Sequence, residues 1–83
     1  MLPDELQRVA IKAKALYQEK YRADLEERNF GLFVCIEPES GDYYLGNTFD
    51  EAVNKAMDAH PDRLTHTLRV GHAAAFHLGV ISQ

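Results

Sequence analysis

Four histidines and one cysteine are the side chains of this sequence best suited to metal or nucleophilic chemistry: His60, His66, His72, His77 and Cys35. A zinc site needs several such ligands at a short, regular spacing, and the histidines instead fall singly along the chain. A lone cysteine allows no internal disulfide and no Cys-x-x-Cys site. We therefore expect no metal ion and no cofactor.

Catalysis by the cysteine would require a nearby base and electropositive surroundings that lower the pKa of its thiol. Cys35 lies instead within the apolar run of residues 31–36, with Glu37 following. The acids Glu37, Glu39 and Asp42 cluster at a turn, but they lack the regular alternation of a calcium-binding loop. We assign no catalytic residue and expect a protein that is not an enzyme.

Charge and hydropathy restrict the partners. The net charge is −4: residues 1–30 carry six basic and six acidic groups, and residues 31–83 carry three basic and seven acidic. That sign is wrong for gripping a phosphate backbone, so we expect no nucleic-acid partner. No apolar run is long enough to span a membrane, and Asp4, Glu5 and Gln7 interrupt any signal peptide. With a single cysteine, the prediction is a cytoplasmic protein.

The elements that position these residues begin with a long helix. With 83 residues, 46% apolar and 27% charged, the chain is expected to form one domain. Apolar residues three and four apart predict an amphipathic helix over 4–28, within a first segment of residues 1–30. At 1.5 Å per residue it would be about 37 Å long, more than a small sheet can cover. The helix must therefore bend, or one end projects as a candidate dimer contact.

A ββαββ core is predicted over residues 31–83. Its first strand is the apolar run at residues 31–36, which Pro38 ends, and a turn through Gly41 leads into a second strand. Setting Glu37 opposite Asp42 gives one coherent apolar face. That register pairs Ile36 with Tyr43 and Val34 with Leu45.

The second helix has clear ends. Thr48 and Glu51 form a capping box, and Pro61 stops the helix after His60. Residues 64–70 then alternate as a strand. A three-residue loop at 71–73 would return the chain as a fourth strand with matching apolar faces, and would place His66 and His77 on opposite faces. A two-residue loop would instead set these histidines opposite each other, as in a metal clip.

The predicted fold is therefore α+β, in the order α-ββ-α-ββ, with a four-stranded, mostly antiparallel sheet in strand order 2-1-3-4. Both helices are expected to cover one face, making a two-layer sandwich. The other face stays open unless the long helix folds across it. An open face rich in aromatic residues and arginine is typical of an interface. The candidate interaction surface on it contains Phe33, Glu37, Tyr44, Thr67, Arg69 and His77.

Residues 31–71 resemble a family of small bacterial proteins, frequent in cyanobacteria, that is known as a domain of unknown function. The matching residues are Ile36, Pro38, Gly41, Asp42, Tyr43, Gly46, Thr48, Glu51, Ala52, Lys55, Ala56, His60, Pro61, Asp62, Arg63, Arg69 and Gly71. Asn47 and the AAAFHLG segment after Gly71 and His72 depart from the pattern. The resemblance implies an αββαβ-type fold and supplies no activity.

Residues 46–52 are also similar to the helix entry of HicB-type antitoxins, a segment that is chiefly a capping box after a strand. The primary hypothesis is a non-catalytic protein-protein interaction module, or one that self-associates as a dimer. The alternatives are an antitoxin-like neutraliser of a partner enzyme and a small metal-binding or enzymatic protein.

Overall fold

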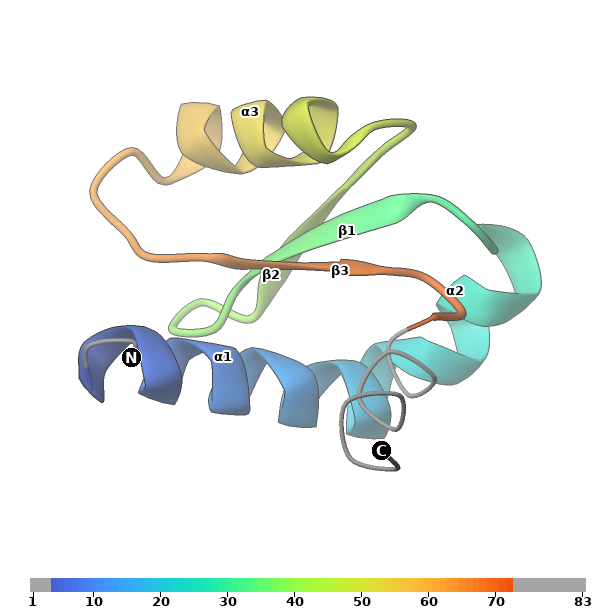
Figure 1. Cartoon of the computed structure of the whole chain (residues 1–83), viewed down its shortest axis with the longest axis horizontal. Coiled ribbons are helices and arrows are strands. Elements are labelled where there is room, and N and C mark those ends of the chain that lie inside the picture. The colour runs from blue at the N-terminus through green and yellow to red at the C-terminus, as the bar shows by residue number, and fades with distance from the viewer. Residues whose placement is uncertain (1–3, 73–83) are drawn as a thin grey trace, which may run out of the picture.

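A computed structural model of the chain describes residues 4–72 and shows an α+β fold (Figure 1). Its elements, in chain order, are α1 (Asp4–Leu16), the π-helical segment η1 (Tyr17–Tyr21), α2 (Arg22–Arg28), β1 (Phe33–Glu37), β2 (Asp42–Gly46), α3 (Phe49–Ala59) and β3 (His66–Arg69). The predicted fourth strand lies outside the described residues. Within them, no helix is long and apolar enough to cross a bilayer.

The three strands form an antiparallel sheet in the order β2-β1-β3. β1 takes the centre, as expected of a strand with apolar residues on both faces. The predicted hairpin register is confirmed: Glu37 lies opposite Asp42, and Ile36 opposite Tyr43. Gly41, with φ of 82°, supplies the left-handed backbone that the turn requires.

The helices cover opposite faces of the sheet, with α1 on one side and α3 on the other (Figure 1). The larger core cluster, on the α1 side, contains Ala13, Tyr17, Leu25, Val34, Ile36, Leu68 and Val70. The smaller cluster, on the α3 side, contains Cys35, Ala52 and Ala56. The prediction of a two-layer sandwich with both helices on one face is therefore wrong. Because β1 is apolar on both faces, each face needs its own cover.

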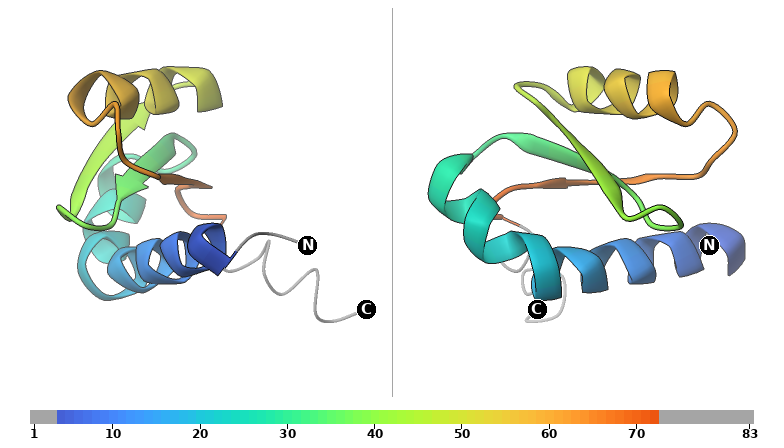
Figure 2. Two further views of the ribbon diagram at one scale, coloured as in Figure 1. Left: turned by 90° about the vertical axis from the view of Figure 1, so that its left-hand side faces the viewer. Right: turned by 180° about the vertical axis from the view of Figure 1, so that it is seen from behind.

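The long first helix bends, which was one of the two outcomes expected from its length (Figure 2). The bend falls at η1, whose two tyrosines are held by different parts of the fold. Tyr17 is buried, and its hydroxyl contacts Glu26 and the Gly71 N–H. Tyr21 packs its ring on Tyr43, with centroids 4.6 Å apart. A π-helical turn widens the helix locally, so both rings can face the sheet.

Helix α3 begins and ends where the sequence predicts. The Thr48 hydroxyl accepts from the Glu51 N–H at 3.1 Å, and the Glu51 carboxylate accepts from the Asn47 N–H at 2.6 Å. The helix ends at Ala59, and the His60 N–H still donates to the Ala56 carbonyl. These caps place the α3 N-terminus directly after β2.

Candidate functional site

The predicted interaction surface lies under α3, so the expectation that this face is open is wrong. Phe33 and Tyr44 are half-buried and pack against the α3 core cluster, and Glu37 is only 1% exposed. Toward β3 the cover is thinner: Thr67 is half-buried and Arg69 is exposed. His77 lies outside the described residues. The physical reason is again that Cys35 and its neighbours on this face needed covering.

Among residues 4–72, Glu37 is the buried charged side chain, and both of its carboxylate oxygens accept hydrogen bonds. Its carboxylate accepts from the backbone N–H groups of Glu39 and Ser40, both at 2.9 Å, and Arg63 Nη1 lies 3.3 Å away. Burial favours the neutral acid, but hydrogen bonds from Ser40 and Glu39 and the charge of Arg63 outweigh it. The pKa of Glu37 is therefore lowered.

His60 joins the end of α3 to the hairpin turn. Its Nε2 lies 3.1 Å from Asp42 Oδ2, and its Nδ1 lies 4.0 Å from the Glu37 carboxylate. Arg63 completes the network by reaching Glu39 at 2.8 Å. Asp42, His60 and Arg63 are among the residues that carry the family resemblance, and here they join separate segments. We interpret this network as a structural tie between β1, β2 and α3.

The remaining candidates for chemistry find no support in residues 4–72. No three His, Cys, Asp or Glu side chains of this part of the chain come together in a way that could hold a metal ion. His66 is half-buried on β3, where burial and the Lys14 ammonium lower its pKa. Cys35 is completely buried. The thiol therefore has no access to a substrate.

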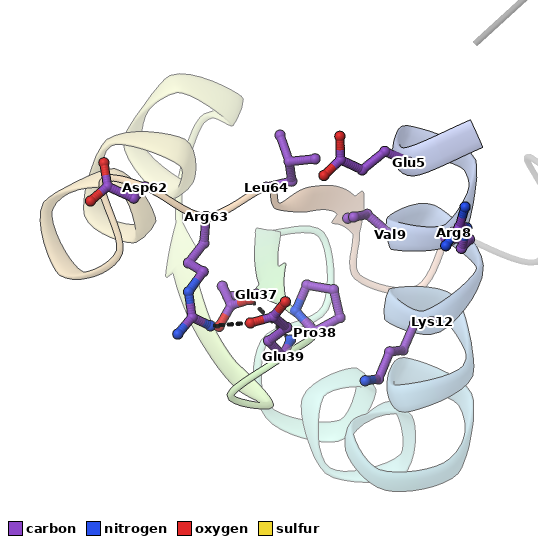
Figure 3. A pocket seen from close by; sticks show the side chains of 10 residues that line it. All are labelled: Glu5, Arg8, Val9, Lys12, Glu37, Pro38, Glu39, Asp62, Arg63 and Leu64. Atoms are coloured by element: carbon purple, nitrogen blue, oxygen red, sulfur yellow. Dashed lines mark hydrogen bonds and ion pairs between the residues drawn. The ribbon is translucent and has the colours of Figure 1, made fainter. Parts of the chain in front are cut away.

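A cleft of about 340 Å³ opens between α1 and the opposite loops, and sequence reasoning missed it (Figure 3). Its lining joins α1, the hairpin turn and the segment after α3: Glu5, Arg8, Val9, Lys12, Glu37, Pro38, Glu39, Asp62, Arg63 and Leu64. The two walls are far apart in the sequence. The two walls come together because α1 crosses the sheet beside the hairpin turn.

A second feature is an apolar strip on the side of α3 away from the contact of Lys55 with the Leu45 carbonyl of β2. We call it, together with Thr67 of β3, the α3–β3 flank: Phe49, Val53, Met57 and Thr67. Phe49 is 53% exposed and Met57 54%. The spacing of Phe49, Val53 and Met57, four residues apart, places them along one side of α3. The structure centres Ala52 and Ala56 on the sheet and packs Val53 against them, which leaves Phe49 and Met57 at the rim.

Searches of protein-family models, curated proteins and solved structures found no match for this chain. The family resemblance and the similarity to antitoxins stay predictions.

Proposed function

We propose that this chain is a non-catalytic interaction module that forms a homodimer through the α3–β3 flank. The observation that carries the proposal is the position of two exposed apolar side chains, Phe49 and Met57, along one side of α3, next to β3, which is an edge strand among the described residues. Scattered exposed apolar residues need no explanation, but a contiguous group is typical of a binding surface. Association would also support a small domain with a limited core.

The edge of β3 can pair with a second strand. Among the described residues, β3 pairs only with β1. The Val70 N–H donates to the Leu32 carbonyl at 2.7 Å, so strand alternation turns the N–H and C=O of Thr67 to the outer edge. An identical β3 from a second copy fits there about a two-fold axis. A register centred on Thr67 sets Arg69 opposite Thr65 of the second copy and avoids opposing like charges.

The path of the chain after β3 favours a second copy over the chain's own residues 73–83 as the occupant. The Gly71 N–H donates to the Tyr17 hydroxyl at 3.2 Å, and the His72 ring lies 5.6 Å from Phe30. Tyr17 belongs to the core cluster on the α1 side. The last described residues are thus held toward the face opposite α3. The fourth strand predicted over residues 73–81 is kept as the competing occupant in the test.

The test is the mass of the full chain in solution, measured by light scattering after gel filtration and by sedimentation equilibrium. We expect a dimer for the natural sequence, a monomer for Met57→Lys, and a dimer for the matched control Ile11→Lys. Ile11 is 68% exposed but lies on α1, across the sheet from the flank. Circular dichroism checks that each variant is folded.

Three outcomes would overturn the proposal. The natural chain could be monomeric at all concentrations, or the two lysine variants could behave alike. A chain ending at residue 72 could also form a dimer while the full chain does not, which would assign the flank to residues 73–83.

A further inference from the structure

One wall of the cleft carries a polarised row of side chains on α1. Glu5, Val9 and Lys12 follow a spacing of four and then three residues, which places them along one side of the helix. Figure 3 shows Glu5 near Leu64 at one end of the cleft and Lys12 near the hairpin turn at the other. Within residues 4–72, neither Glu5 nor Lys12 has an ion-pair partner. The row thus runs from negative through apolar to positive.

The opposite wall of the cleft also carries apolar and charged side chains. Leu64 presents apolar surface beside the largely buried Pro38, Glu39 belongs to the turn, and Arg63 lies beside it (Figure 3). Arg63 uses only Nη1 for its two ion pairs, with Glu37 and Glu39. A guanidinium has five N–H donors, so Nε and Nη2 stay available within the described structure. Arg8, Glu37 and Asp62 complete the charged lining.

We propose that this cleft binds a short apolar peptide with both ends free, its ammonium at Glu5 and its carboxylate at Lys12 and Arg63. Seven residues of α-helix separate Glu5 from Lys12, a rise of about 10 Å. Because an extended chain spans about 3.3–3.6 Å per residue, a peptide of about two or three residues matches that distance. The two charges of a free amino acid are too close together to reach both ends.

The middle of the peptide would lie on Val9 and Leu64, which favours small apolar side chains. The cleft volume of about 340 Å³ lies at the lower end of the range for ligand sites. Glu39 is 72% exposed and shares Arg63, so it competes with the incoming carboxylate. We therefore expect weak binding, in the submillimolar to millimolar range.

The test is a titration of the isotope-labelled full chain, followed by amide chemical shifts in NMR spectra. Ala-Leu-Ala should give saturable shifts at Val9, Lys12, Glu39 and Leu64. N-acetyl-Ala-Leu-Ala, Ala-Leu-Ala amide and free leucine should each bind more weakly. The proposal fails if millimolar Ala-Leu-Ala moves none of these signals, or if the blocked peptides bind as well as the free one.

Matched variants test which side chains bind the two charged ends of the peptide. Lys12→Gln and Glu5→Gln should each weaken Ala-Leu-Ala about two- to fivefold, the range expected for an exposed ion pair. Lys20→Gln and Glu27→Gln, exposed on η1 and α2, are the controls and should leave the affinity unchanged. Equal losses in all four variants would show that the effect does not depend on where the charge lies, and would refute the site. The same titration is repeated with the Met57→Lys variant, which we expect to be monomeric. If that variant binds the peptide, the cleft does not depend on the proposed dimer.

Discussion

Glu37 shows how one side chain can hold a turn in place. Its carboxylate accepts two backbone N–H groups and faces Arg63 from the other side. Replacing it with Gln puts an amide N–H₂ where an acceptor is needed, so we expect Glu37→Gln to lower the free energy of unfolding by about 1–3 kcal/mol. Urea unfolding measures the loss. Glu39→Gln removes an exposed partner of the same arginine and should cost at most about 1 kcal/mol.

The same residue should make stability depend on pH. The pKa of Glu37 in the folded protein is lowered from 4.5. As the pH falls through 4.5, the unfolded chain takes up a proton before the folded one, so the free energy of unfolding decreases until the folded pKa is passed. Above 4.5 the contribution is fully present. Glu37→Gln should therefore flatten the decline of stability in this acid window, and an unchanged slope would contradict the assignment.

At the scale of elements, the sequence predicts what local rules determine. Thr48 and Glu51 mark the start of α3 because capping needs only neighbouring residues, and the hairpin register follows from keeping Val34 and Ile36 on one apolar face. The assignment of helices to faces could not be predicted, because both faces of β1 are apolar and accept either helix. Contacts such as Arg63 with Glu37, which lie 26 residues apart, leave no local pattern.

The candidate sites were harder to predict than the elements. The row of Phe49, Val53 and Met57 has the same spacing as a buried helical face, and only the position of Ala52 on the sheet shows that Phe49 and Met57 lie at the rim. The cleft depends on α1 passing beside the turn at Pro38, which is a tertiary contact. The predicted surface failed for the same reason: its exposure depended on the face that α3 covers.

The junction between β2 and α3 offers a test of this packing. A Cβ added at Gly46 would lie 2.5 Å from the Ala52 backbone nitrogen and 2.9 Å from the Glu51 Cβ. We expect Gly46→Ala to lower the free energy of unfolding by about 1–3 kcal/mol, because the first turn of α3 must move away from β2. Thermal and urea unfolding provide the measurement. Asn47→Ala, at the next exposed position, should change stability by about 0.5 kcal/mol or less. If Gly46→Ala left the free energy of unfolding unchanged, α3 would have to lie farther from β2 than the structure shows.

At the scale of the whole molecule, the two faces of the sheet are covered unequally. The α1 side buries large side chains such as Tyr17 and Leu25, whereas the α3 side buries Cys35 and two alanines. Small residues let α3 approach the sheet closely, but they bury little apolar area. The larger apolar side chains of α3, Phe49 and Met57, remain at its rim. A second copy on this side would supply the missing cover.

The unequal cover of the two sheet faces predicts that stability depends on protein concentration. If dimerisation through the α3–β3 flank stabilises only the folded state, mass action raises the Tm as the concentration increases. We expect this rise for the natural chain and for Ile11→Lys, measured by differential scanning calorimetry over a hundredfold range of concentration. Met57→Lys should show one Tm at all concentrations and match the dilute natural chain, because an exposed substitution changes monomer stability by about 0.5 kcal/mol or less. A natural chain whose Tm is constant over that range would mean that α3 is stable without a partner, and that the flank serves no dimer.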